Sequence, residues 1–389
     1  MSKKKICVVI NNRANYARIK SFLIEAKKNK KIDLQIIAAG SSVLSKYGSV
    51  DKILADDKLK LNLKLHTIVE GNEPICMVKT TSQTLSELST AFSRLKPEIV
   101  VVIGDRYENL AVAIAASYMN ISLAHIQGGE VTGSIDETVR HAITKLSHIH
   151  FVCTKRAKIF LIKMGEKKET IFNTGCPSID LVNKLDKKID INFSNKNRLK
   201  SVGDKINFKK KYIVVLFHPV TTEFNKNKDY ISQLLKALEL LDNKIQVVIL
   251  WPNIDSGTDY ISKAIRIFLN KKKNYKIAAY INFSPEDYIK LIYNSISLIG
   301  NSSSGIRESS FMGLPVVNIG SRQRNRERGK NVFDVKNKTI EILDAINKQM
   351  VKKKFKKSNL YGDGKSGKRI VNILLKSKIE RTKTLNYLK

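Results

Sequence analysis

The sequence predicts two α/β domains, each a doubly wound parallel sheet covered by helices, and three observations support this prediction. Strand-like apolar runs alternate with helix-like segments over almost all of the 389 residues. Runs such as EIVVVIG (98–104) are apolar at consecutive positions, as in parallel strands buried on both faces. The alternation stops once, in a Lys-, Asn- and Ser-rich stretch at 185–210. We therefore expect a first domain at 1–184, a linker at 185–210 and a second domain at 211–365.

The elements of the first half follow from their local patterns. The expected strands are short apolar runs: KICVVI (5–10), IDLQIIAAG (32–40), EIVVVIG (98–104), ISLAHI (121–126), IHFVC (149–153) and TIFNTG (170–175). The expected helices have apolar residues at helical spacing: ANYARIKSFLIEAKK (14–28), NLAVAIAASYMN (109–120), DETVRHAITKLSH (136–148) and TKRAKIFLIKMG (154–165).

The second half repeats this order of strands and helices. Its expected strands lie in the runs YIVVLFHP (212–219), IQVVILWPN (245–253), KIAAYI (276–281), SLIGNSS (297–303) and PVVNIG (315–320). Its expected helices are YISQLLKALELL (230–241), ISKAIRIFLN (261–270), PEDYIKLIYN (285–294) and GIRESSFMG (305–313). The last segment is amphipathic, so we expect a C-terminal helix at 366–389 that packs back on the first domain.

The charge of the chain restricts the kinds of partner it can have. It carries 70 Lys and Arg against 35 Asp and Glu, a formal net charge of +35. The lysines recur along most of the chain, and no aromatic residues are interleaved with them in an RNA-binding pattern. A solvated lysine-rich surface therefore explains the charge better than a nucleic-acid groove does. The positive field would still attract an anionic small molecule, such as a nucleotide sugar.

The sequence offers no sign of a membrane segment, a disulfide framework or a metal site. No apolar run reaches the ~18 residues that a spanning helix needs, and the apolar stretch near the N-terminus is too short for a signal peptide. The four cysteines are scattered without a CxxC pair, which is typical of buried thiols. We expect a cytosolic protein with no metal and no cofactor.

Polar residues follow the expected strands with a regularity that surface charge alone would not produce. Ligands of open parallel sheets bind beyond the carboxyl ends of the strands, so two such domains would face a ligand cleft. The residues at these ends are Asn12, Arg13, Asp105, Arg106, His125, His218, Asn253, Asp255, Asn301, Ser302, Ser303 and Arg322.

The stretch HIQGGEVTGSIDETVRHA (125–142) gathers acidic residues beside basic ones. Ser134 and Glu137 have the spacing of a capping box at the start of a helix. That interpretation leaves Glu130 unexplained, and also Asp136, which lies four residues before Arg140 on the same helical face. An aspartate near an arginine and a helix N-terminus stays ionised, so the stretch suits acid/base chemistry. By contrast, Asp105 and Arg106 alone could be a helix cap with an incidental arginine.

Two motifs of the second half suit an anion. In GNSSSGIRES (300–309), Gly and Ser at a strand-to-helix turn would leave main-chain N–H groups and hydroxyls free for a phosphate. Glu308, one turn later, could bind the ribose hydroxyls, and Arg322 lies near the same edge. His218 follows a strand and precedes Pro219, where it could contact phosphate or serve only the fold.

These motifs, taken in order, resemble the hydrolysing UDP-N-acetylglucosamine 2-epimerases, a family that includes bacterial sialic-acid-pathway enzymes and the epimerase half of the vertebrate bifunctional epimerase/kinase. The matching motifs are LHTIVEG (65–71), GDRYE (104–108), the stretch 125–148, GCPSID (175–180), FHPVTTE (217–223), WPNIDSG (251–257), GNSSSGIRE (300–308) and LYGDG (360–364). The resemblance implies a glycosyltransferase-B-like fold of two Rossmann-like domains. It also implies cleavage of the sugar–nucleotide bond with inversion at C2, by elimination and then hydration.

The resemblance also assigns roles to residues at matching positions. It implies that Asp105, Glu130, Asp136 and Arg140 lie around the sugar, with the carboxylates as acid/base candidates. Expelling a diphosphate needs positive charge or donors on the leaving oxygens, so His218 is counted with this catalytic group. The residues expected to hold the substrate and its nucleotide are Arg13, Arg106, Gln127, Asn253, Ser302, Ser303, Glu308 and Arg322.

Three positions depart from the family pattern. Gln127 stands where HIEGG is usual, Asn15 where NRAD is usual, and Ser42 where a GSHL-like stretch has His. Glutamine cannot exchange a proton at neutral pH, so either Glu130 or Asp136 replaces the missing carboxylate or the sugar is different. All three departures are expected to face the sugar.

The sequence leaves more than one hypothesis for the function of the chain. The primary hypothesis is a UDP-N-acetylglucosamine 2-epimerase that releases N-acetylmannosamine and UDP for sialic-acid-type biosynthesis. The alternative is the same reaction on a UDP- or GDP-linked 2,4-diacetamido-2,4,6-trideoxyglucose, on the way to legionaminic-type acids. A glycosyltransferase and a nucleic-acid-binding protein rank below both. Family members are often dimers or tetramers, so we also expect a homo-oligomer.

Overall fold

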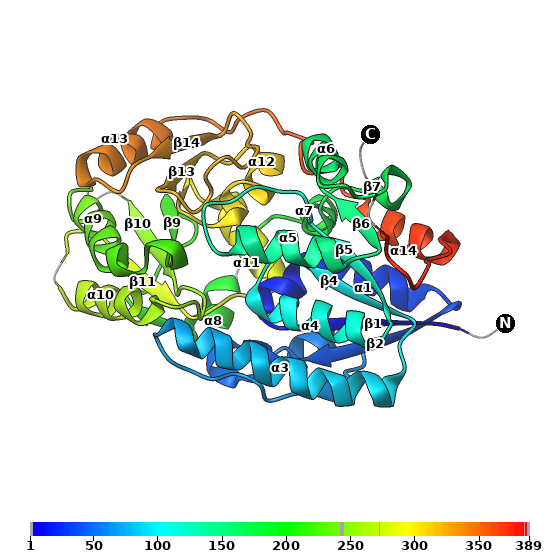
Figure 1. Ribbon diagram of the computed structural model, residues 1–389. Helices are drawn as coiled ribbons and strands as arrows, with labels where there is room; N and C mark the ends of the chain where they lie inside the picture. Colours follow the sequence, from blue (N-terminus) through cyan, green and yellow to red (C-terminus); the bar gives the residue numbers. More distant parts are fainter. Residues whose placement is uncertain (1–2, 191, 242–244, 272, 385, 387–389) are drawn as a thin grey trace. The chain divides into compact units, whose positions relative to one another are not determined.

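A computed structural model of the chain describes residues 3–190, 192–241, 245–271, 273–384 and 386 (Figure 1). The chain forms two compact units. Unit 1 comprises Met1–Glu130, Ile135–Lys184 and Tyr361–Lys389, and unit 2 comprises Val131–Ser134 and Leu185–Leu360. Within the described residues, each unit is built on one seven-stranded sheet.

The sheet of unit 1 is parallel throughout, in the order β3-β2-β1-β4-β5-β6-β7. Its strands are β1 (Lys4–Ile10), β2 (Ile32–Ala38), β3 (Leu63–Lys64), β4 (Ile99–Ile103), β5 (Ser122–Ile126), β6 (Ile149–Val152) and β7 (Ile171–Asn173). Strands β1, β4 and β5 are almost entirely buried, as their consecutive apolar residues predict. The strand order reverses between β1 and β4, which is where parallel sheets open a crevice for ligands.

Helices cover both faces of this sheet. They are α1 (Arg13–Lys28), α2 (Asp51–Asp56), α3 (Pro74–Leu95), α4 (Tyr107–Tyr118), α5 (Asp136–Leu146), α6 (Lys155–Lys163), α7 (Pro177–Lys184) and α14 (Ser366–Lys376), with short 3₁₀ turns η1 (Gly40–Val43), η2 (Ser45–Tyr47) and η3 (Lys168–Thr170). One core cluster joins α1 and the strands, and a second lies under α3, α4 and α5.

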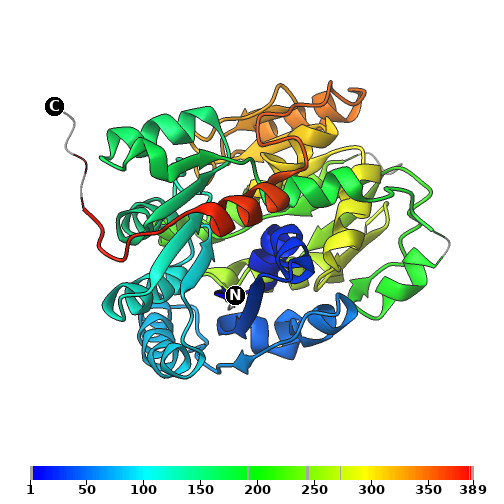
Figure 2. The ribbon, with the colours of Figure 1, turned by 90° about the vertical axis from the view of Figure 1, so that its right-hand side faces the viewer.

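The C-terminal helix α14 packs on unit 1, beside α1 and α7 (Figure 2). Its residues Ile370, Val371 and Leu374 belong to the same core cluster as Phe22 of α1. The helix ends at Lys376, earlier than the expected range 366–389, because the residues that follow are mostly polar and leave little apolar surface to bury. Residues 385 and 387–389 of that range lie outside the described part of the chain.

The sheet of unit 2 has the order β14-β13-β12-β9-β10-β11-β8, and only β8 runs antiparallel among the described strands. The strands are β8 (Ser201–Gly203), β9 (Tyr212–Leu216), β10 (Gln246–Leu250), β11 (Ile277–Tyr280), β12 (Leu298–Gly300), β13 (Val316–Ile319) and β14 (Val332–Val335). The helices are α8 (Phe193–Arg198), α9 (Asn227–Glu239), α10 (Thr258–Asn270), α11 (Pro285–Asn294), α12 (Glu308–Met312) and α13 (Thr339–Met350), with 3₁₀ turns η4 (Thr221–Lys226) and η5 (Ser303–Gly305).

The segment 185–210, which we expected to be a linker, is part of unit 2 and contains α8 and β8. Phe193 explains the difference, because its ring packs against Phe208 with centroids 5.0 Å apart and against Phe283 at 5.9 Å. These buried aromatic contacts anchor a segment whose composition is that of a loop. No described helix is long and apolar enough to cross a membrane.

Candidate functional site

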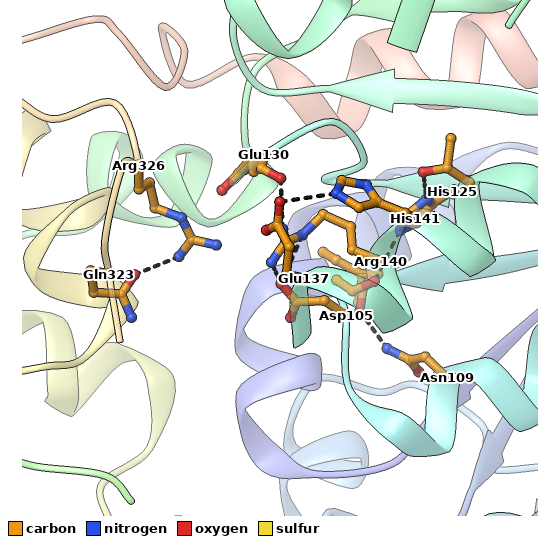
Figure 3. A network of polar contacts seen from close by, with 12 residues as sticks. Asp105, Asn109, His125, Glu130, Glu137, Arg140, His141, Gln323 and Arg326 are labelled. Carbon is orange, nitrogen blue, oxygen red and sulfur yellow. Dashed lines mark hydrogen bonds and ion pairs between the residues drawn. The ribbon is translucent and has the colours of Figure 1, made fainter. Parts of the chain in front are cut away.

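The side chain of Arg140 lies at the centre of a buried acidic cluster in unit 1 (Figure 3). Its Nε donates to Asp105 Oδ2 at 3.0 Å, and its Nη2 pairs with the same oxygen. Its Nη1 donates to Glu137 Oε2 at 2.7 Å and to the main-chain oxygen of Glu130 at 2.6 Å. Asp105 follows β4 and Glu130 follows β5, and these strands are neighbours, so strand order brings the predicted residues together around α5.

The charged side chains at the centre of this cluster are buried and remain ionised. The Arg140 side chain is 0% exposed and that of Asp105 is 10% exposed. Burial alone would lower the pKa of Arg140, but Asp105, Glu130 and Glu137 outweigh it and raise the pKa, so Arg140 remains a cation. A fixed cation beside several carboxylates can orient acid/base groups and stabilise negative charge that develops on a substrate.

The predicted capping box is wrong. Helix α5 begins at Asp136, and no side chain caps its first turn. Glu137 instead binds Arg140 and places its Oε1 2.9 Å from Nε2 of His141. The buried guanidinium is a stronger partner than the main-chain N–H that a capping box would offer. Asp136, the first residue of α5, is half-buried.

His125 links this cluster to the turn after β4. Its Nε2 donates to the main-chain oxygen of Gly104 at 2.9 Å, and its Nδ1 lies 3.3 Å from the hydroxyl of Thr144 on α5. Burial lowers the pKa of His125 to about 3, so the ring is neutral at physiological pH. His125 therefore connects β5, α5 and the residue before Asp105, and sequence reasoning assigned it no such role.

Arg106 and Arg13 lie at the same edge of the sheet as Asp105. Arg106 forms a two-pronged pair with the fully buried Glu108, with Nε–Oε2 at 2.9 Å and Nη2–Oε1 at 3.0 Å. Arg13 begins α1 directly after β1, and burial lowers its pKa to about 10. Glu108 was not singled out in the sequence, although its spacing from Arg106 allows the pair.

The three departures from the family pattern are buried side chains held by protein contacts. The Nε2 of Gln127 donates to Cys176 Sγ at 3.1 Å. The hydroxyl of Ser42 lies 2.7 Å from the main-chain oxygens of Ile10 and Ala39, and Asn15 is 1% exposed. We expected these side chains to face the sugar. All three side chains are buried, and two of their oxygens, Gln127 Oε1 and Asn15 Oδ1, have no hydrogen-bond partner among the described residues. That they face the sugar stays a prediction.

In unit 2, Asn301 ties two strand ends together. Its side chain accepts from the His218 main-chain N–H at 2.7 Å and donates to the His218 carbonyl at 2.8 Å. The N–H of Asn253 donates to His218 Nδ1 at 3.2 Å. Because Nδ1 is an acceptor, a neutral His218 carries its proton on Nε2, where it can donate to an anion. Arg322 Nη1 donates to the Asn301 carbonyl at 3.2 Å, which brings a cation to the same edge.

The serine motif differs from the expected helix terminus. It forms the 3₁₀ turn η5, in which the N–H groups of Gly305, Ile306 and Arg307 bond to carbonyls of Ser302 and Ser303. These N–H groups are therefore occupied within the turn, since the 3₁₀ geometry closes on itself before α12 begins. The serine hydroxyls are further donors that this turn can offer to an anion.

Neighbouring groups donate hydrogen bonds to two serine hydroxyls of this turn. The Ser302 hydroxyl accepts from the N–H of Ser304 at 3.3 Å, and Ser304 accepts from the Tyr288 hydroxyl at 2.8 Å, so both serines keep their own O–H to donate. Glu308 begins α12, and its carboxylate has no ion pair or hydrogen bond with any described residue. In the same unit, Arg326 Nη1 donates to Gln323 Oε1 at 2.7 Å (Figure 3). Gln323 Nε2 donates to the Asn301 carbonyl at 3.0 Å.

Gly300 makes the turn possible. Its φ is +134°, and a Cβ at this position would lie 2.0 Å from the main-chain oxygen of Leu216 on β9. Only glycine allows β12 to approach β9 this closely before the chain turns. Across the described residues, no group of three or more His, Cys, Asp or Glu side chains could hold a metal ion.

Comparison with known proteins gives the family. The family model described as UDP-N-acetylglucosamine 2-epimerase matches residues 24–375. A UDP-N,N'-diacetylbacillosamine 2-epimerase (hydrolyzing) of Legionella pneumophila is 35% identical over 371 residues, which cover 95% of each chain. A GDP/UDP-N,N'-diacetylbacillosamine 2-epimerase (hydrolyzing) of Campylobacter jejuni is 33% identical over 359 residues, covering 92% of this chain and 90% of that one.

The fold has a close counterpart among solved structures. The structure of UDP-GlcNAc 2-epimerase from Neisseria meningitidis bound to UDP-GlcNAc aligns with a TM-score of 0.78 at 20% identity, covering 96% of this chain and 100% of that one. This likeness confirms the predicted fold class, two Rossmann-like α/β domains of the glycosyltransferase-B kind. The family predicted from the motifs is confirmed as well: the chain belongs to the UDP-N-acetylglucosamine 2-epimerase family.

Proposed function

We propose that this chain is a hydrolysing 2-epimerase whose substrate is a UDP-linked 2,4-diacetamido-2,4,6-trideoxyglucose, that is, UDP-N,N'-diacetylbacillosamine. Both relatives described above carry that sugar in their names, at 35% and 33% identity over nearly the whole chain. This supports the alternative predicted from the sequence over the sialic-acid-type hypothesis. UDP-N-acetylglucosamine is the second candidate, because the matching family model is described by it.

The reaction has two stages. A carboxylate takes the proton from C2 while the C1–O bond to UDP breaks, which leaves a 2-acetamidoglycal and UDP. Water then adds across the double bond, with hydroxyl at C1 and a proton delivered to C2 from the opposite face. The sum is nucleotide sugar plus water giving UDP and a free sugar inverted at C2, with no redox step and no cofactor.

The buried Arg140 cluster is the observation that carries this proposal. A weakly acidic C2 proton needs a carboxylate fixed at contact distance, and Asp105, Glu130 and Asp136 are the candidates in unit 1. Arg140 holds Asp105 in place through two nitrogens. Because Gln127 cannot exchange a proton, we assign proton transfer at C2 to Glu130 and Asp136.

Unit 2 supplies the groups that we assign to the nucleotide. His218 would donate from Nε2 to the leaving diphosphate, and Ser302 and Ser303 would bind its oxygens. Arg322 adds a positive charge at this edge, which stabilises the charge that develops as the C1–O bond breaks. The buried, unpaired carboxylate of Glu308 suits two ribose hydroxyls, which are hydrogen-bond donors. From unit 1, we assign Arg13 and Arg106 to the diphosphate.

Assays with a panel of nucleotide sugars test the proposed identity of the substrate. The purified chain is incubated with UDP-N,N'-diacetylbacillosamine, its GDP analogue and UDP-N-acetylglucosamine, and free sugar is measured by NMR. We expect the highest kcat/KM for the UDP-linked diacetamido sugar. A higher value for UDP-N-acetylglucosamine would move the assignment to the second candidate, and a higher value for the GDP analogue would overturn the choice of uracil.

Two further predictions from the sequence remain proposals. We expect a homo-oligomer, and sedimentation of the purified chain tests this. We also expect a cytosolic location, which fits a substrate that is a nucleotide sugar.

A further inference from the structure

The chain returns to helix α5 after α14 has ended. We call residues 377–384 the C-terminal strap. Lys383 Nζ donates to the main-chain oxygen of Thr144 at 2.9 Å and also to that of Ser147. Nearby, the ring of His148 contacts the main-chain oxygen of Arg381 at 2.9 Å. The last carbonyls of a helix attract cations, so Lys383 caps the C-terminal end of α5 together with the N–H of Ser147, which donates to the same Thr144 carbonyl at 3.1 Å.

A buried carboxylate holds Lys383 in this position. Glu166 is 3% exposed, and its Oε2 lies 2.6 Å from Lys383 Nζ and 3.0 Å from His150 Nε2. Its Oε1 lies 3.0 Å from Lys145 Nζ, which comes from α5 itself. Burial alone would raise the pKa of Glu166, but His150 and Lys383 outweigh it and lower the pKa to about 2. Glu166 is therefore an ionised anchor for the strap.

The capped end of α5 is joined to the acidic cluster by two routes. One route is the helix itself, an eleven-residue element that begins with Asp136 and carries Arg140. The other runs through Thr144, whose main-chain oxygen accepts from Lys383 and whose hydroxyl meets His125 Nδ1 at 3.3 Å. His125 Nε2 then donates to Gly104 at 2.9 Å, next to Asp105. Any shift of α5 along its axis would move both Arg140 and the turn that holds Asp105.

We propose that Lys383 is a positioning residue: by capping α5 from the C-terminal strap, it sets where Asp136 and Arg140 lie relative to Asp105. This inference rests on the proposed epimerase function. Lys383 itself touches no reacting atom, because its contacts are the helix end and Glu166. Its effect is on the geometry of acid/base groups at the other end of one rigid helix, where small misplacements cost large factors in rate.

Four variants test this. Lys383→Met keeps the aliphatic stem but removes the charge and the donors, and Lys383→Arg keeps both. Lys378→Met is the matched control, since Lys378 lies in the strap, is exposed and contacts no described carboxylate. Lys383→Gln, which retains two N–H donors, replaces Lys383→Met if that variant is recovered unfolded.

The measurements are kcat, KM, UDP affinity by calorimetry, and amide hydrogen exchange in the peptide that covers α5. For Lys383→Met we expect kcat to fall about 10-fold or more, with KM and UDP affinity within about twofold. Exchange at the C-terminal end of α5 should rise, Lys383→Arg should recover most of the rate, and Lys378→Met should match the parent chain. Lys383→Gln should lie between the parent and Lys383→Met.

Two outcomes overturn the proposal. One is a folded Lys383→Met or Lys383→Gln variant with the parent's kcat, even if its melting temperature is lower, because that is the result of a purely structural contact. The other is unchanged exchange in α5. Failure of the proposed epimerase function can be distinguished from failure of the role proposed for Lys383. In the first case the parent chain would release no sugar from any substrate of the panel, while the exchange experiment would still report whether Lys383 holds α5.

Discussion

Replacing Arg140 by Met tests the cluster on which the acid/base assignment depends. The change removes a fully buried guanidinium that binds Asp105 through two nitrogens and Glu137 and the Glu130 carbonyl through a third. Methionine fills much of the volume, so the loss is mainly electrostatic. The carboxylate of Asp105, 10% exposed, would remain in the protein without its counter-ion.

The expected cost is large. Removing one partner of a buried ion pair lowers the free energy of unfolding by about 3–5 kcal/mol, since the remaining charge is neither solvated nor paired. At about 2–4 °C per kcal/mol for a domain of this size, the melting temperature of unit 1 should fall by roughly 6–20 °C. Urea denaturation and calorimetry measure both quantities, and catalytic release of sugar should be lost.

Three comparisons make this prediction specific. Arg140→Lys keeps a charge but not the two-pronged geometry, so it should lie between the parent and Arg140→Met. Adding Asp105→Asn to Arg140→Met removes the stranded charge and should recover part of the lost stability. Arg94→Met, at an exposed arginine of α3, should change stability by less than about 0.5 kcal/mol. A melting temperature for Arg140→Met within 2 °C of the parent would refute a role for this cluster in holding unit 1 together.

Three further predictions concern other parts of the chain. Asp136→Asn should abolish turnover and leave UDP affinity almost unchanged in calorimetry; a parallel loss of UDP affinity would instead assign Asp136 to site geometry. Gly300→Ala should destabilise unit 2 and weaken UDP binding, because its Cβ would meet the Leu216 carbonyl oxygen at 2.0 Å, and unaltered melting would contradict that close approach. The pKa of Glu166 is lowered to about 2 from its ordinary value of 4.5, so at pH values above 4.5 the ionised carboxylate should stabilise the fold by roughly 3 kcal/mol. This stabilisation should be lost as the pH falls toward 2, and Glu166→Gln should therefore flatten the acid side of a stability–pH curve measured with urea.

The sequence was sufficient to predict the two sheets, because strands and helices follow from local apolar patterns. It also placed Asp105 at a strand end and Glu130 and Arg140 in one acid/base stretch, and the order of the strands then brought the three residues together. The family prediction depended on whole motifs in their order along the chain.

What local patterns could not predict are contacts between distant parts of the chain. Glu137 has the spacing of a capping residue, yet it binds Arg140 because the fold buries that guanidinium beside it. Lys383 meets Glu166 across 217 residues of sequence, a contact that only the return of the chain through α14 creates. The spacing of Gly and Ser also does not reveal that the serine turn is a 3₁₀ turn whose main-chain N–H groups bond within the turn.

The linker prediction failed for a related reason. A segment rich in Lys, Asn and Ser looks like a loop, but Phe193 and Phe208 within it are enough to anchor α8 on unit 2. Two buried rings can outweigh the composition of the residues around them.

Exchange of the hydrogen at C2 with solvent is the most direct test of the proposed elimination and hydration. The chain is incubated with UDP-N,N'-diacetylbacillosamine in D2O without any acceptor, and the released sugar is examined by NMR. Elimination followed by hydration predicts a free sugar of inverted configuration that carries deuterium at C2. Release of an unlabelled sugar of unchanged configuration, or no release until an acceptor is added, would contradict it.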